Sequence, residues 1–190
     1  RRPPISTLFP STTLFRSAEL RDLLVTNWMT HDAMWFACSA RVCGIETTNV
    51  VDRGAAKAMA EVEAQRLQKA PGVARIVSFD QLQRFLGGAF ELVRGPFMKF
   101  TLTYPEANLM RWETEQCFVH DGVSKLGMID RYECGVFDRL EGWLESLGVE
   151  FRVTPEIDGC FLHRLGRCVR EYRFAFQPAA GGAGIRSEEH

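Results

Sequence analysis

The spacing of apolar residues changes at Pro96, and this change constrains the fold more than any other feature of the sequence. Before Pro96 the apolar residues recur every three or four positions, which is the period of an amphipathic helix. After it they alternate with polar residues, as a half-buried strand does, at Met98, Phe100, Leu102 and Tyr104. The sequence therefore predicts an α+β fold, with N-terminal helices packed on a four-stranded antiparallel sheet that a long helix interrupts.

Three helices are expected before Pro96, at residues 19–41, 48–69 and 78–93. The first should have one buried face, formed by Leu20, Leu23, Leu24, Trp28, Trp35 and Val42. The third begins with a capping box, because Gln81 follows Ser78 by three residues. All three should pack on the sheet that follows.

The second half of the chain should begin with a β-hairpin, formed by strands at 98–104 and 109–119 and a turn at 105–108. A single long helix is expected from 121 to 147, with Gly148 as its C-terminal cap. Segments 149–153, 160–163 and 168–176 have the character of strands.

Both ends of the chain resemble translated short-read sequencing adapters. The opening RRPPISTLFPSTTLFRS (residues 1–17) and the closing RSEEH (residues 186–190) carry this likeness. We therefore expect residues 1–17 to be adapter-derived and outside the fold, residues 18–177 to form a single domain, and residues 178–190 to be a linker-like tail with an adapter-derived end.

Charge and hydropathy exclude two classes of partner. The chain has 23 basic and 24 acidic side chains, whereas nucleic-acid binding needs a basic surface. No apolar run approaches the roughly 18 residues that a membrane span needs. We expect a cytoplasmic protein with neither nucleic acid nor membrane as partner, and the sequence does not indicate an oligomeric state.

Cysteines and histidines gather between residues 117 and 168, and their spacing suggests a metal site. Two-residue gaps let one turn present two ligands, and thiolate with neutral imidazole suits tetrahedral zinc. Packing thiols, a redox or disulfide pair and a catalytic nucleophile are the alternatives. We expect the four thiols to converge, with a histidine able to replace one of them, so that the candidate zinc ligands are Cys117, His120, Cys134, Cys160, His163 and Cys168.

A second candidate site lies on the first helix. His31 is three residues from Trp28 and four from Trp35, and Asp32 lies at the edge of the same face. These four residues could line a small-molecule pocket in which burial tunes the imidazole for proton transfer. A core histidine bonded to a backbone carbonyl, with Asp32 in solvent, explains the same spacing.

Four segments carry a resemblance to a known family: THDAMWF, CFVHDGVSKLG, YECGVFDRLEGWL and the Cys160-x7-Cys168 ending. Over residues 27–176 the chain resembles an uncharacterised prokaryotic family of unknown function. More distantly it is similar to the L-2-amino-thiazoline-carboxylate hydrolase group and to the vinyl-reductase-type small-molecule-binding domain. The latter likeness implies that Cys160 and Cys168 face one another, although Arg170 stands where that domain has an aromatic residue.

Three classes of function follow from these features. The preferred one is a small-molecule-binding or sensor domain that holds its ligand between the first helix and the sheet and carries a structural Cys/His metal site. The alternative is a small hydrolase that attacks a cyclic amide or thiazoline-like substrate with metal-bound water or thiolate, His31 or His120 moving protons. An interaction subunit would need neither metal nor pocket.

Overall fold

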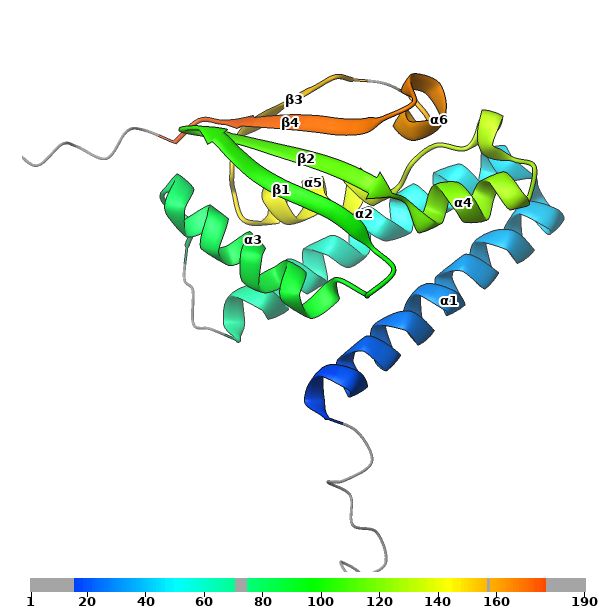
Figure 1. Ribbon diagram of the computed structural model, residues 1–190, viewed down its shortest axis with the longest axis horizontal. Coiled ribbons are helices and arrows are strands. Elements are labelled where there is room, and N and C mark those ends of the chain that lie inside the picture. The colour runs from blue at the N-terminus through cyan, green and yellow to red at the C-terminus, as the bar shows by residue number, and fades with distance from the viewer. Residues whose placement is uncertain (1–15, 71–74, 157, 177–190) are drawn as a thin grey trace, which may run out of the picture.

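The computed structural model describes residues 16–70, 75–156 and 158–176 (Figure 1). In chain order its elements are α1 (Ser17–Cys43), α2 (Ile45–Lys69), α3 (Phe79–Val93), β1 (Lys99–Glu106), β2 (Leu109–Gln116), α4 (Phe118–Lys125), the 3-10 helix η2 (Ile129–Arg131), α5 (Val136–Ser146), β3 (Phe151–Thr154), α6 (Phe161–Leu165) and β4 (Cys168–Phe174). Helices precede a four-stranded antiparallel sheet, so the predicted α+β class is confirmed. Within these residues, no helix is both long enough and apolar enough to cross a membrane.

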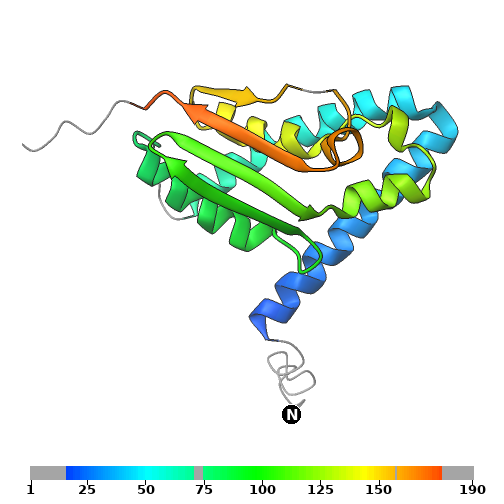
Figure 2. The same cartoon turned by 45° about the horizontal axis from the view of Figure 1, so that its top comes forward.

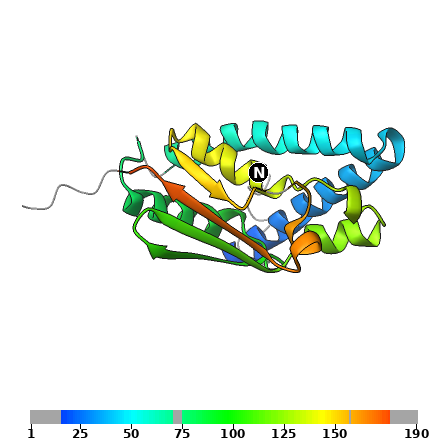
Figure 3. The same ribbon diagram turned by 90° about the horizontal axis from the view of Figure 1, so that it is seen from above.

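The sheet has the strand order β1-β2-β4-β3, and every neighbouring pair is antiparallel. Helices α2, α3 and α5 lie against one face of it, as Figures 1 and 3 show. The main core fills this layer with alanines from α2, four side chains each from α3 and α5, and aromatic residues from the strands: Ala60, Ala64, Leu82, Phe85, Leu86, Ala89, Phe137, Leu140, Trp143, Leu144, Phe100, Trp112, Tyr172 and Phe174.

The predicted N-cap of α3 and the predicted hairpin turn are confirmed, whereas the second bond of the capping box is made to Val77 and not to Ser78. Ser78 is the N-cap of α3, where its Oγ accepts from the backbone N–H of Gln81 at 3.3 Å. The Gln81 side chain in turn accepts from the backbone N–H of Val77 at 2.8 Å. The hairpin of β1 and β2 turns at Asn108, which adopts a positive φ of 60°.

The single long helix predicted for 121–147 is wrong. The structure divides this stretch into α4, η2 and α5. Gly127, with φ at +68°, follows the end of α4, and the chain passes through η2 before α5 begins at Val136. The apolar stripe behind the prediction runs from Val136 to Leu147 and so lies in α5 and its C-cap, and it carried no information about the break before it.

The strand predicted at 160–163 is also wrong, because Cys160 is the N-cap of the short helix α6. A four-residue segment is too short for periodicity to separate strand from helix. The positive φ of Gly166 ends α6 and leads into β4. Without this segment the sheet has four strands.

Helix α1 differs from its prediction in packing. Only Val25 and Ala40 are buried on it, whereas most of the face predicted to be buried is exposed, including Leu24 at 60% and Val42 at 84%. Its main contact is with α2, and Figures 1 and 2 show it running obliquely away from the sheet. Of the three N-terminal helices, α2 and α3 therefore contribute to the core under the sheet and α1 does not.

The predicted end segments lie almost wholly outside the described residues. Residues 1–15 and 177–190 belong to that undescribed part. Arg16 and Ser17 are described: Arg16 is the N-cap of α1, and its backbone N–H donates to the Glu19 carboxylate at 2.8 Å.

Candidate functional site

The pocket residues predicted on the first helix lie on an open surface. The side chains of His31 and Asp32 are 68% and 51% exposed, and the His31 Nδ1 is 3.5 Å from the Asp32 Oδ1. Trp35 is also exposed, whereas Trp28 is half-buried under the Arg139 guanidinium, 4.7 Å from its ring centroid. Within the described chain, His31 is therefore neither enclosed in a pocket nor held in the core.

The predicted zinc ligands lie where α4, α5, α6 and β4 begin. Cys117 and Cys160 are the N-cap residues of α4 and α6, Cys168 is the first residue of β4, and Cys134 precedes α5 by two residues. Cys117, Cys160 and Cys168 are all near enough to Cys134 for their charges to raise its pKa. The structure thus brings the four cysteines into one region.

The two histidines of the predicted set contact carboxylates instead. His120 Nδ1 is 3.1 Å from the Asp121 Oδ1, and His163 Nε2 is 2.8 Å from the Asp130 Oδ1. Across residues 16–70, 75–156 and 158–176, no three His, Cys, Asp or Glu side chains form a group that could hold a metal ion. Zinc stays a prediction, which metal analysis of the purified protein would test.

Burial keeps the thiols of Cys117, Cys134 and Cys168 protonated. It raises the pKa of Cys134 to about 12 and that of Cys168 to about 11, and it also raises the pKa of Cys117. The thiolate is the nucleophile and the metal ligand, so these residues carry little of the reactive form at neutral pH. The local environment therefore suits packing thiols better than a catalytic nucleophile.

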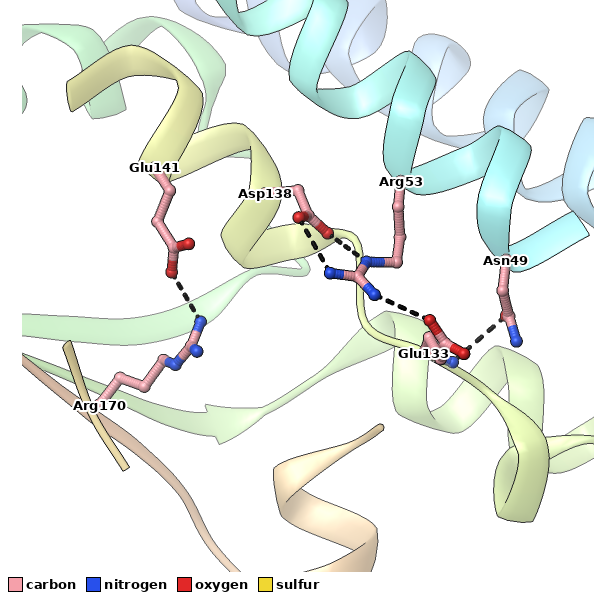
Figure 4. A network of polar contacts seen from close by, with 6 residues as sticks. All are labelled: Asn49, Arg53, Glu133, Asp138, Glu141 and Arg170. Atoms are coloured by element: carbon pink, nitrogen blue, oxygen red, sulfur yellow. Dashed lines mark hydrogen bonds and ion pairs between the residues drawn. The ribbon is translucent and has the colours of Figure 1, made fainter. Parts of the chain in front are cut away.

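A charged network that sequence reasoning missed lies between α5 and β4 (Figure 4). Arg170 on β4 is the cross-strand partner of the buried Trp112, so its side chain lies on the sheet face that the helices cover. Its Nη1 donates to the Glu141 Oε1 of α5 at 2.8 Å, and the Tyr172 hydroxyl donates to the same oxygen at 3.1 Å. One carboxylate oxygen thus joins three residues from two elements.

The guanidinium of Arg170 is held by aromatic rings as well as by this carboxylate. It lies 4.5 Å from the ring centroid of Phe137 and 4.9 Å from that of Phe161. The Arg170 side chain is only 11% exposed, and its Nε is fully buried with no hydrogen-bond partner among the described residues. Burial raises the pKa of Glu141, while the charge of Arg170 and the Tyr172 hydrogen bond oppose the rise.

Two further ion pairs, both made by Arg53, lie beside the Arg170–Glu141 pair (Figure 4). Arg53 of α2 donates through Nε to Asp138 and through Nη1 to Glu133, both at 2.8 Å. Asn49 fixes the same loop, because its side-chain oxygen accepts from the Glu133 backbone N–H and its amide donates to the Arg131 carbonyl. Helix α2 thereby holds the loop that leads into α5.

A cavity of about 70 Å³ lies between these ion pairs. Its walls combine two arginines, four carboxylates, two aromatic rings, one glycine and one cysteine: Arg53, Arg170, Glu133, Asp138, Glu141, Asp158, Phe137, Phe161, Gly159 and Cys134. Cys134 places the cavity next to the cysteine region. This charged cavity, rather than the first helix, is the candidate site.

The fold and this site define the class of protein: an α+β domain with a charged cavity between its helical layer and its sheet. The chain belongs to the family of unknown function DUF6125, which matches residues 16–144. The match includes Arg53, Cys134, Asp138 and Glu141, while Arg170 lies beyond it on β4. No curated protein and no solved structure matches the chain, and no link to the thiazoline hydrolases or to the vinyl-reductase-type domains is shown.

Proposed function

We propose that this chain is a small-molecule-binding domain whose ligand enters the charged cavity between α5 and β4. The observation that carries the proposal is the buried Nε of Arg170, a donor without a partner in the described part of the chain. Leaving such a donor unpaired costs about 1–3 kcal/mol, and more for a charged group. A ligand that brings an acceptor to this nitrogen recovers that cost.

The volume of the cavity and the charges of its wall limit which ligands it can hold. Drug-sized ligands occupy pockets of about 300–1,000 Å³. A cavity of about 70 Å³ therefore takes a small polar molecule or the polar end of a larger one. A carboxylate or an amide supplies the acceptor for Arg170, and an amide also offers a donor to the carboxylates of the wall.

A hydrolase acting on a cyclic amide or thiazoline-like substrate is the alternative function, and it would use the same cavity. Thiolate attack would require Cys134 to ionise. Burial raises the pKa of Cys134 to about 12, which favours binding over attack by this residue. The structural zinc site remains a separate proposal, which the nearness of the four cysteines supports.

The proposal predicts that Arg170→Lys abolishes binding of small acetyl compounds while keeping the positive charge beside Glu141. Acetate and acetamide, added at millimolar concentration and constant ionic strength, should raise the melting temperature of the parent protein saturably. A bound ligand stabilises by RT ln(1 + [L]/Kd), about 2.7 kcal/mol at 100 times Kd. The Arg170→Lys protein lacks the Nε donor and should show no saturable rise.

Arg173→Lys is the matched control, because Arg173 lies on the same strand but is exposed and pairs with Glu106. This variant should respond to the ligands as the parent does. If the parent responds to neither compound, or if Arg170→Lys responds as strongly as the parent, the cavity is not the binding site.

A further inference from the structure

Helix α1 exposes large apolar side chains on one side, in two groups that the polar residues Asn27 and His31 separate. Three of them lie in the first two turns and three in the second half of the helix, within one side of it. All are exposed, Trp35 at 64%. We call these residues the α1 face: Leu20, Leu23, Leu24, Met34, Trp35 and Val42.

The α1 face is too apolar to be explained by the packing within one chain. Helices of globular proteins gain most of their stability from packing of an apolar face. Helix α1 has 27 residues and buries only Val25 and Ala40, on a different side from the α1 face. The DUF6125 match begins at residue 16, so the whole of α1 belongs to the domain that the family shares.

We propose that the α1 face is a homodimer interface, in which α1 pairs antiparallel with α1 of a second copy. Charge identifies this occupant. Glu19 and Arg41 are about six helical turns apart and lie along the same edge of the α1 face. A two-fold axis near the middle of the helix places Glu19 of each copy opposite Arg41 of the other, so the pair forms twice.

Both charged residues are exposed, and their contacts among the described residues are local. Glu19, whose side chain is 49% exposed, accepts from the Arg16 backbone N–H and pairs with the Arg16 side chain. Arg41 donates to the Cys38 Sγ at 3.2 Å. Antiparallel pairing also sets the two helix dipoles in opposite directions, which is favourable.

A hollow beside α1 could receive a side chain of the second copy in the antiparallel dimer. It has a volume of about 570 Å³ and lies between the first half of α1 and the end of α3. Its walls are mostly apolar: Leu20, Leu24, Val25, Trp28 and Leu92, with Ser17 and Arg21. In the antiparallel pair, Trp35 of the second copy lies at the level of Val25, where this hollow can receive its ring.

Sedimentation of the purified chain over micromolar concentrations tests the interface. The parent should show a monomer–dimer equilibrium, and Leu24→Glu should raise the dimer Kd by roughly tenfold or more, because it puts a charge in one of the apolar parts of the contact. Leu165→Glu is the control: Leu165 is similarly exposed but lies on α6, so its Kd should equal that of the parent.

Charge exchange tests the antiparallel pairing itself. Glu19→Arg or Arg41→Glu alone turns two attractive pairs into two repulsive ones and should raise Kd roughly three- to tenfold. The double variant restores both pairs and should return Kd to the parent value. Thermal unfolding of each variant checks that the monomer remains folded.

Three results would overturn the proposal. They are a parent that stays monomeric throughout, a dimer that forms equally well with Leu24→Glu, and a double charge variant that is no tighter than its single variants. The last would mean that the copies meet in another geometry.

Discussion

Asp52 is a carboxylate that folding buries against the loop before α5. A Cβ added to Gly135 would lie 3.0 Å from its Oδ2, so little space separates the two residues. Burial raises the pKa of Asp52, and the charges of Asp32 and Asp138 raise it further. Ionisation of Asp52 is therefore less favourable in the folded protein than in the unfolded chain.

We predict that Asp52→Asn stabilises the protein at pH 7. A pKa raised by folding means that the folded state binds the proton more tightly, so stability falls as pH rises from the ordinary value of 3.8 to the raised value. The variant escapes this loss. Its melting temperature should exceed that of the parent at pH 7, and the gain should vanish below pH 3.8. A gain that persists at low pH would contradict this explanation.

Of the residues that line the charged cavity, the sequence pattern could indicate Arg170 but not its partner. Alternate residues of β4 (Cys168, Tyr172 and Phe174) are apolar, and Arg170 interrupts them on the same face. A charge in that position signals a buried partner. The partner, Glu141, comes from a helix whose register against the sheet depends on tertiary packing, so local patterns could not identify it.

At the scale of the elements, helices α2 and α5 pack closely against each other at Gly142 of α5. A Cβ added to Gly142 would lie 2.7 Å from the Cβ of Ala60 and 3.3 Å from the Lys57 carbonyl oxygen. Ala60 is fully buried. The same helix pair carries the Arg139–Glu63 ion pair at 2.7 Å, so its spacing is set by polar as well as apolar contacts.

Gly142→Ala should therefore destabilise the protein, although alanine favours a helix. Overpacking of a core costs about 1–3 kcal/mol, which exceeds the roughly 0.5–1 kcal/mol that alanine gains over glycine inside a helix. Chemical denaturation should report a lower free energy of unfolding. The matched control is Gly87→Ala in α3, where an added Cβ meets nothing within 4 Å; it should be neutral or stabilising. Equal effects at the two sites would contradict the close approach of the helices.

Elements with several turns or a strong turn signal were predictable, and short ones were not. Helix α3 has a serine N-cap and a long apolar stripe, and the hairpin has a change of period and a turn segment, so each has two independent signals. Helix α6 has five residues, which is little more than one turn. The breaks around η2 depend on backbone conformation at Gly127, which apolar spacing does not encode.

In the molecule as a whole, the helices differ in how much of their surface is buried. The main core joins the sheet to α2, α3 and α5, whereas α1 lies outside it (Figure 2). The apolar residues of α1 recur at helical spacing, which predicted a helix with one buried face. That pattern does not tell whether the apolar side is covered by the same chain or by another one, and here the single chain leaves it open.

This unevenness predicts how amide hydrogen exchange is distributed. At low protein concentration, amides in the first half of α1 should exchange faster than those of α5 and β4, because few buried contacts hold that half in place. Raising the concentration should slow exchange in α1 alone if a second copy covers the α1 face, since dimerisation stabilises the elements it buries. In Leu24→Glu the exchange of α1 should stay fast at every concentration. Protection of α1 that matches α5 in dilute protein would mean that the helix is held within its own chain, and the dimer would then be unnecessary to explain its stability.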